Sequence, residues 1–348
     1  MSGTSLDGLD IAACEFFYED EKWNFRIIKG FTYKYNSGWD QRLAALPHSD
    51  ALTFARTHVE YGHLLGRLTR EFIEKTGFSP DLVTSHGHTI FHRPDQGFTT
   101  QIGDGSAIAA ETGLPVVCDF RSADVALGGQ GAPLVPLGDR LLFPRFDACL
   151  NLGGFANISM ESESGRIAFD ICPVNIVLNR LASELGHSYD KDGEIARSGK
   201  IDQQLLQNLN DLQYYTRKPP KSLGREWIEN EFLQVLNVPT LPVKDIMKTV
   251  CEHVALQVNL ALSGMPPLKV LTTGGGTFNQ FLIERINHLS DHKWIVPDDD
   301  LINFKEALIF AFLGLMRILG HPNVLKSVTG SSRNHSSGAL YRLFGEHL

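Results

Sequence analysis

Apolar and polar positions alternate near the start of the chain, and this period of two is typical of a half-buried β-strand. The alternation runs through residues 9–14 and leads into Phe16 and Phe17. An acidic stretch at residues 19–21 predicts a turn. Apolar positions resume at residues 23–28, which predict a second strand.

Other parts of the chain have the spacing of amphipathic helices, in which apolar residues recur every three or four positions. Residues 51–76 predict one long helix of this kind, which ends at a glycine. Residues 176–259 predict mostly helical structure, with interruptions at 191–200 and 216–224. Residues 304–319 are so apolar that the helix they predict must be largely buried.

Several predicted strands run directly into glycine-rich turns. Residues 81–92 predict a strand that enters a glycine turn, and residues 114–120 predict another strand. Residues 147–160 predict a strand, a Gly-Gly turn and a second strand, and residues 166–170 add a third. Residues 268–286 predict a strand, a triple-glycine turn and a helix. This mixture of hairpins and strand–helix units predicts an α/β fold.

Two segments have the composition of irregular structure. Residues 121–138 contain four glycines and two prolines, which favour a loop or a crossing between domains. Within it, Arg121 and Asp124 form either a salt bridge inside the loop or contacts to a ligand. Residues 331–338 are polar and predict a solvated loop.

Length and charge narrow the class of protein. The chain has 348 residues, which suits two domains of ordinary size. Its net charge of −8 argues against a dedicated nucleic-acid-binding protein, which normally carries a basic surface. No stretch reaches the roughly 18 apolar residues of a membrane span. Five scattered cysteines without a CxxC pair predict free thiols in a reducing cytosol.

The glycine turns carry the first chemical prediction. Glycine lets the backbone approach a bulky ligand, and inward-pointing turn amides bind anions. Turns at residues 3–8, 153–154 and 274–276 therefore favour a clamp for nucleotide phosphates, although neither a P-loop nor a Rossmann fingerprint is present. Asp7 fits such a site only with Mg²⁺ between it and the phosphate, because like charges repel. Taken alone, Asp7-Gly8 is equally well a plain hairpin turn.

Acidic and histidine side chains supply further candidates. Asp170 ends a predicted strand, where a carboxylate facing a cleft acts as a general base; a helix N-cap or a surface aspartate is the alternative. Glu306 opens an apolar helix, where the helix dipole favours an acid in any case. His86, His88 and His92 fit no common zinc spacing, so hydrogen bonding to substrate or within a turn is favoured over a metal site.

Seven segments closely resemble the anhydro-N-acetylmuramic acid kinases, a family in the actin, hexokinase and Hsp70 superfamily of ATP-binding folds. The resemblance runs nearly from end to end and is most specific at residues 101–136. The segments are MSGTSLDGLD, QIGDGSAIAAETGLPVVCDFRSADVALGGQGAPLVP, NLGGFANIS, YDKDGEIARSGK, GREW, TTGGGTFN and EALIFAFL.

The resemblance implies a two-lobed α/β fold of the ribonuclease H-like type, with a mixed five-stranded sheet in each lobe and ATP in a central cleft. The first lobe would contain residues 1–140 and about 322–348, and the second would contain residues 141–321. The resemblance also implies ATP and Mg²⁺ as cofactors.

The resemblance assigns roles to individual residues. Asp170 would be the catalytic base, and Asp7 would hold Mg²⁺ through water. Arg121, Asn175 and Glu306 would lie near the sugar. The residues that would contact ATP are Gly3, Thr4, Ser5, Leu6, Asp7, Gly8, Leu9, Asp10, Gly153, Gly154, Asn157, Gly274, Gly275 and Gly276.

The implied reaction combines hydrolysis with phosphoryl transfer. A water activated by the aspartate attacks the anomeric carbon of 1,6-anhydro-N-acetylmuramate, the bridge opens, and O6 takes the γ-phosphoryl group of ATP. The resemblance further implies a cytoplasmic homodimer in peptidoglycan recycling, with no membrane or nucleic-acid partner. The alternative is a degenerate nucleotide-binding relative with a regulatory role, or a kinase for a related small sugar.

The chain departs from the family pattern at three places. The family has a strand immediately before the first phosphate hairpin, whereas Met1 lies at the hairpin itself, so we expect a short strand to be missing before it. The family typically has Asp-Thr-Gly-Pro-Gly-Asn where residues 170–175 are Asp-Ile-Cys-Pro-Val-Asn. His88 stands where glutamine is usual.

Overall fold

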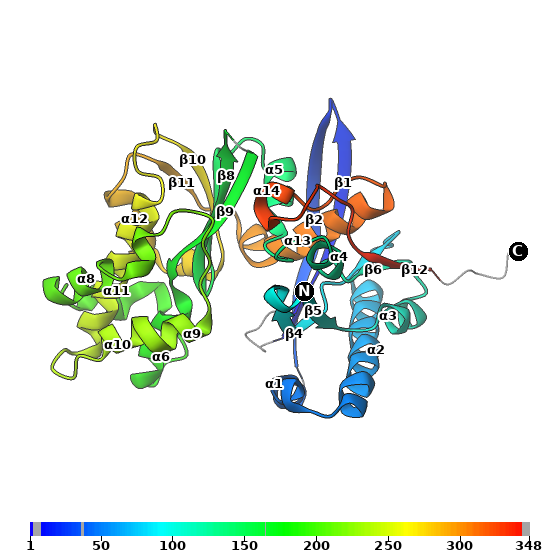
Figure 1. Cartoon of the computed structure of the whole chain (residues 1–348), viewed down its shortest axis with the longest axis horizontal. Coiled ribbons are helices and arrows are strands. Elements are labelled where there is room, and N and C mark those ends of the chain that lie inside the picture. The colour runs from blue at the N-terminus through cyan, green and yellow to red at the C-terminus, as the bar shows by residue number, and fades with distance from the viewer. Residues whose placement is uncertain (3–7, 36–37, 164, 343–348) are drawn as a thin grey trace, which may run out of the picture. The chain divides into compact units, whose positions relative to one another are not determined.

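The computed structural model describes residues 1–2, 8–35, 38–163 and 165–342. The chain folds as two compact units (Figure 1). Unit 1 contains Met1–Phe143 and Phe304–Leu348, and unit 2 contains Pro144–Asn303. Each unit combines strands with helices, so the predicted α/β class is confirmed.

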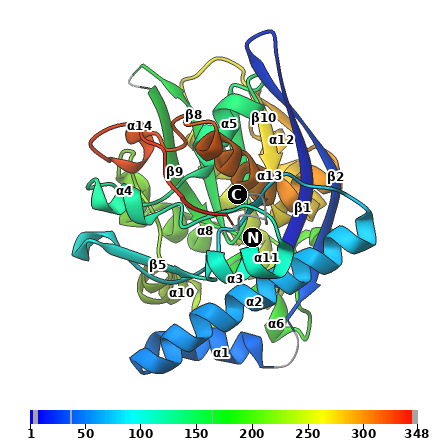
Figure 2. The ribbon, with the colours of Figure 1, turned by 90° about the vertical axis from the view of Figure 1, so that its right-hand side faces the viewer.

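The longest strands of unit 1 form one antiparallel hairpin, β1 (Gly8–Glu19) with β2 (Lys22–Lys34), which Figure 2 shows as a long ribbon. Asp20 and Glu21 have φ angles of 49° and 59°, as a two-residue turn that matches the twist of the strands requires. The hairpin predicted from alternation is therefore confirmed.

The remaining strands of unit 1 form two small sheets. One has the order β12 (Ala339–Tyr341), β6 (Val116–Cys118) and β3 (Val83–Thr84), and the other pairs β4 (His88–Arg93) with β5 (Phe98–Ile102). Unit 1 thus differs from the expected single five-stranded sheet. The physical reason is that, within the described ranges, no strand joins β1 to β3.

The long helix of unit 1, α2 (Ala51–Thr76), begins where the Asp50 side chain accepts a hydrogen bond from the Thr53 amide and ends at Gly77 (φ 67°). α4 and α5 form within residues 121–138, so the prediction of a plain loop there is wrong in part. The other helices of unit 1 are α1 (Trp39–Ala45), α3 (Gly105–Thr112), α4 (Ser122–Ala126), α5 (Val135–Leu142), α13 (Asp299–Ile318) and α14 (Lys326–Thr329), with short turns η1 (Leu46–His48) and η2 (Pro94–Gln96).

The chain returns to unit 1 at Phe304, earlier than the expected boundary near residue 322. The cause is the packing of α13, the strongly apolar helix predicted from the sequence. Phe312 of α13 contacts Phe16 and Trp23 of the hairpin, with ring centroids 5.4 and 5.2 Å apart. The helix is therefore largely buried, as predicted.

Unit 2 contains the expected mixed five-stranded sheet, in the order β11-β10-β7-β8-β9. β10 is parallel to both β7 and β11, whereas β7, β8 and β9 are antiparallel neighbours. The strands are β7 (Ala148–Leu152), β8 (Phe155–Ser162), β9 (Gly165–Pro173), β10 (Lys269–Thr273) and β11 (Lys293–Ile295).

Helices cover the unit 2 sheet and bury its apolar side chains, among them Leu150 and Val270. The helices are α6 (Asn175–Glu184), α7 (Glu194–Ser198), α8 (Gln203–Asn210), α9 (Arg225–Trp227), α10 (Leu233–Leu236), α11 (Val243–Leu260) and α12 (Gln280–His288), with short turns η3 (Lys191–Gly193), η4 (Gln213–Thr216), η5 (Ile228–Phe232) and η6 (Gly275–Phe278). All five cysteines are free, as predicted. Among the described residues, no helix has both the length and the apolar character needed to cross a membrane.

Candidate functional site

Two of the glycine turns come together at one end of the unit 2 sheet. Gly153 and Gly154 connect β7 to β8, and Gly274 follows β10, the parallel neighbour of β7. Because the two strands are parallel, both turns leave from carboxyl ends on the same edge. This is the edge at which open α/β sheets bind their ligands.

The turn after β10 lies so close to β7 that only glycine fits at two of its positions. Gly274 has a φ of 88°, and a Cβ there would lie 2.8 Å from the Leu152 carbonyl oxygen. A Cβ on Gly276 would lie 2.8 Å from the Cβ of Leu152. At Gly275 the nearest atom would be 3.7 Å away, so this backbone segment remains open to a ligand.

Asn175 is bonded to the first of these turns and to the end of β7. Its amide donates to the Gly153 carbonyl over 3.2 Å, and its side-chain Nδ2 donates to the Leu152 carbonyl over 3.3 Å. Asn175 thus lies beside Gly153, and its predicted place near the sugar stays a prediction.

A row of polar side chains runs from these turns to the expected base. Asn151 of β7 lies opposite Asn157 of β8, which lies opposite Asp170 of β9. Residues directly opposite in antiparallel strands project from the same face. All three are partly exposed, whereas most of their neighbours along β7 and β8 are buried. The sequence predicted Asn157 and Asp170 but missed Asn151, because its partner is set by strand register.

The Asp170 carboxylate is held by a distant segment. Its Oδ2 accepts from the Leu223 amide over 2.9 Å, and its backbone carbonyl accepts from the Tyr214 hydroxyl over 2.6 Å. Its backbone amide donates to the Lys221 carbonyl over 3.1 Å. No hydrogen bond to Oδ1 is made within the described part of the chain. Burial raises the pKa of Asp170, and the Leu223 amide partly opposes this.

The residues that replace the family's threonine and glycines after Asp170 point into the core. Ile171, Cys172 and Val174 are 3%, 0% and 0% exposed. None of residues 170–175 has a positive φ, so the backbone here does not require glycine. The departure is thus accommodated by packing rather than by strain.

In unit 1, Arg121 lies just before α4 and is fixed by two neutral groups. Its Nε and Nη2 donate to Nε2 of His86 over 3.0 and 2.8 Å, and its Nη1 donates to the Gly131 carbonyl over 2.7 Å. Burial lowers the pKa of Arg121 to about 10, which still leaves the guanidinium charged at neutral pH.

Glu306 and Asp10 belong to the same electrostatic neighbourhood as Arg121. Burial raises the pKa of Glu306, the Arg121 charge opposes this, and the Asp10 charge adds to it. The Glu306 side chain is exposed on α13. Asp10 accepts a hydrogen bond from the Thr32 hydroxyl over 2.6 Å.

Asp124 has a structural role. Its side chain is 0% exposed and accepts hydrogen bonds from the Gly131 amide (2.7 Å) and the Thr329 hydroxyl (2.8 Å), with His335 2.9 Å away. Burial acts to raise the pKa of Asp124, but these hydrogen bonds outweigh it and lower the pKa. Because Ser331 also joins this cluster and Ser337 is buried, the prediction that residues 331–338 form a solvated loop is wrong in part.

The three histidines take part in hydrogen bonds, the use favoured from the sequence. His86 accepts from Arg121, His88 Nδ1 lies 2.9 Å from the Ser2 hydroxyl, and His92 Nδ1 lies 3.1 Å from that of Thr99. In the ranges that the structure describes, no group of three or more histidine, cysteine or acidic side chains is placed to hold a metal ion.

The first glycine turn falls largely outside the described residues, which exclude Gly3, Thr4, Ser5, Leu6 and Asp7. Gly8, Leu9 and Asp10 are described and begin β1. The predicted metal contact of Asp7 therefore stays a prediction.

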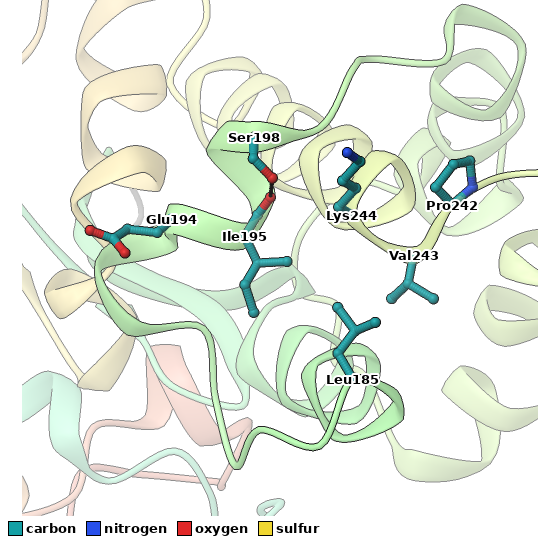
Figure 3. Close-up of a pocket in the computed structure, with 7 residues that line it drawn as sticks. All are labelled: Leu185, Glu194, Ile195, Ser198, Pro242, Val243 and Lys244. Carbon is teal, nitrogen blue, oxygen red and sulfur yellow. Dashed lines mark hydrogen bonds between the residues drawn. The ribbon is translucent and has the colours of Figure 1, made fainter.

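A separate hollow lies on unit 2. Figure 3 shows Leu185, Ile195 and Val243 pointing toward one another, while the Ser198 hydroxyl donates to the Ile195 carbonyl over 2.8 Å. None of the predicted site residues lines this hollow.

Comparison with known proteins identifies the family. The family model for anhydro-N-acetylmuramic acid kinase matches residues 1–343. This chain belongs to the anhydro-N-acetylmuramic acid kinase family. It is therefore an enzyme of this kinase family, for which ATP and a sugar are the implied substrates. The resemblance deduced from the sequence is confirmed.

Curated anhydro-N-acetylmuramic acid kinases match over their whole length. The protein from Aliivibrio fischeri is 36% identical over 369 residues, covering 98% of this chain and 97% of that protein. The proteins from Vibrio cholerae and Pseudomonas savastanoi pv. phaseolicola are each 35% identical, covering 98% of this chain and 96% and 97% of theirs. The alternative of a degenerate nucleotide-binding relative is not favoured.

Two solved structures also match, at low similarity. The activator of 2-hydroxyisocaproyl-CoA dehydratase from Clostridium difficile with bound ADPNP has a TM-score of 0.40 at 13% identity, covering 81% of this chain and 84% of that one. Component A of (R)-2-hydroxyglutaryl-CoA dehydratase from Acidaminococcus fermentans has a TM-score of 0.41 at 13% identity, covering 86% and 91%.

Proposed function

We propose that the chain converts 1,6-anhydro-N-acetylmuramic acid, water and ATP into N-acetylmuramate 6-phosphate and ADP. The observation that carries the mechanism is the row of Asn151, Asn157 and Asp170, which connects the expected ATP turns to a carboxylate with one oxygen fixed and the other free. This arrangement suits a base beside a phosphoryl donor.

In the proposed reaction, Oδ1 of Asp170 takes a proton from water as the water oxygen bonds to C1 of the sugar. The bond between C1 and O6 breaks, O6 bonds to the γ-phosphorus, and the bond from that phosphorus to ADP breaks. The Leu223 amide fixes the other carboxylate oxygen. Burial makes Asp170 a stronger base than a solvated aspartate.

The glycine turns of unit 2 bind ATP in this proposal. Gly154 and Gly275 present backbone that side chains leave open, beside Gly153, Gly274 and Gly276, with Asn157 in the adjoining row. Mg²⁺ would be held through Asp7 and Asp10 and would neutralise charge on the phosphates. In unit 1, Arg121 and Glu306 bind the sugar.

The proposal extends to the setting of the enzyme. The substrate belongs to peptidoglycan recycling, and the free cysteines suit a cytoplasmic enzyme. A homodimer is expected, and light scattering after size-exclusion chromatography gives its mass directly; a monomer at micromolar concentration would contradict that part.

An isotope experiment tests the reaction. The enzyme is incubated with ATP, Mg²⁺ and the anhydro sugar in H₂¹⁸O, followed by phosphorus NMR and mass spectrometry. We expect one phosphate at O6 and one ¹⁸O at C1. Phosphate without ¹⁸O would indicate a simple sugar kinase, and nucleotide binding without a sugar product would indicate a binding protein; either result overturns the proposal.

A further inference from the structure

Arg121 is fixed along part of its guanidinium group and free elsewhere. A guanidinium has five N–H donors. Three of them are used, by the two bonds to His86 Nε2 and the one to Gly131. The two that remain, one each on Nη1 and Nη2, have no partner in the part of the chain that the structure describes. Two adjacent nitrogens therefore still offer N–H groups to a ligand.

The partners of Arg121 leave its positive charge unmatched. The carbonyl of Gly131 is neutral, and His86 is neutral as well, because its Nδ1 donates to the Gly87 carbonyl over 3.0 Å and leaves Nε2 as an acceptor. Burial and the Arg121 charge lower the pKa of His86 well below its usual value. Among the described residues, no carboxylate forms an ion pair with Arg121.

The nearest acids do not cancel this charge. Glu306 and Asp124 are close enough to raise the pKa of Arg121. Among the described residues, however, Glu306 forms no ion pair with Arg121, and Asp124 is engaged by Gly131, Thr329 and His335. A partly buried cation held by neutral groups attracts an anion. The planar fork of arginine matches the two oxygens of a carboxylate.

We propose that Arg121 binds the lactyl carboxylate of the sugar and that this contact selects muramic over glucosamine sugars. The inference rests on the proposed function, in whose reaction that group is the only substrate carboxylate. His86 is a positioning residue: it does not touch the sugar but sets the orientation of the guanidinium. Phe310 supports both residues, with its ring centroid 4.8 Å from that of His86 and 6.0 Å from the Arg121 Cζ.

Three sugars test the contact in the unmodified enzyme: the anhydromuramic acid, its lactyl methyl ester, and 1,6-anhydro-N-acetylglucosamine, which lacks the lactyl group. The ester loses the charge and adds one methyl group. We expect kcat/KM for the acid to exceed that for the ester at least about tenfold, the effect of losing hydrogen bonds to a charged group. Equal values for acid and ester would overturn the inference without a variant that has to fold.

Variants test whether Arg121 causes the preference for the acid over the ester. Arg121→Gln should bring the acid-to-ester ratio toward one, whereas Arg67→Gln, on a surface arginine of α2, should keep it. His86→Leu should lower the ratio mainly through KM for the acid, and His86→Gln, which retains an acceptor, should restore part of it. If Arg121→Gln lowers turnover of all three sugars in equal proportion, Arg121 binds a phosphate instead and the inference is wrong.

The two failures are distinguishable. If no sugar gives a product with label at C1, the proposed function fails. If acid, ester and glucosamine sugar all give labelled product with equal efficiency, the proposed function stands and only the assignment of Arg121 fails.

Discussion

At the residue scale, Asp170 has to be ionised to accept a proton. Burial raises its pKa above the usual value of aspartate, so kcat/KM should rise with pH through that raised pKa and then level off. Asp170→Asn should lower kcat by about 10²–10⁴ while ATP affinity, measured by calorimetry, stays the same. A variant that loses ATP affinity but keeps its turnover rate would contradict the role of base.

His88 makes stability depend on pH. Burial lowers its pKa to about 4, whereas an unfolded chain titrates near about 6.5. The neutral ring contributes its full stabilisation above about pH 6.5, the pKa in the unfolded chain. This contribution is lost as the pH falls toward about 4, the pKa in the folded protein. At pH 5 the free energy of unfolding is therefore lower by about 2 kcal/mol than at neutral pH.

His88→Gln should therefore flatten this dependence. Urea unfolding at pH 7.5 and pH 5 should show a smaller difference in the variant, by about 2 kcal/mol. His321→Gln, at an exposed histidine of the same unit, is the matched control. An unchanged pH dependence in the His88 variant would rule out this assignment.

At the scale of elements, the turn after β10 should tolerate a methyl group at one glycine and not at the next. Gly276→Ala brings a Cβ within 2.8 Å of Leu152, whereas Gly275→Ala meets nothing closer than 3.7 Å. We expect Gly276→Ala to lower the Tm by several degrees through overpacking, and Gly275→Ala to change it little. Calorimetry of both variants decides this, and equal melting temperatures would show that the turn can move away from β7.

The sequence predicted those elements whose pattern is local. The alternation at residues 9–14, the helix end at Gly77 and the glycine turns each reflect a few consecutive residues. It could not predict Leu223 as the partner of Asp170, because the two lie 53 positions apart. Nor could it predict that Ser331 and Ser337 are buried, since the cluster beside them joins Thr329 to Asp124 across 205 positions.

At the scale of the whole molecule, the two units differ in the completeness of their sheets. Five strands are continuous in unit 2, whereas in unit 1 β1 pairs with β2 and β3 pairs with β6. A cavity of about 450 Å³ is lined by residues 9–17 and 82–86 of these two sheets. Its walls include the apolar side chains of Leu65, Phe72 and Phe310.

The hydrogen bonds along this cavity show what would fill it. The Met1 carbonyl accepts from the Asp10 amide over 2.8 Å, and the Met1 amino group donates to the Asp10 carbonyl over 2.7 Å. This reciprocal pair is one rung of an antiparallel ladder on the free edge of β1. On the other wall of the cavity, the amides of Val83 and Ser85 donate to the carbonyls of Pro115 and Val117. Because backbone groups alternate in direction along a strand, the amide and carbonyl of Thr84 face the cavity.

A strand placed ahead of Met1 should therefore stabilise unit 1. Five alternating valine and isoleucine residues, joined to Met1, would continue the ladder along β1 and bury side chains against both walls, as strands covered on two faces do. We expect a Tm higher by about 5 °C and slower hydrogen exchange in both residues 9–17 and residues 82–86.

An extension of equal length made of glycine and serine is the control, since it can pair but has little to bury. Ala311→Phe, which fills the cavity from α13, should abolish the gain. If the apolar and polar extensions give the same Tm and leave exchange at residues 82–86 unchanged, the cavity in unit 1 is not a place for a strand.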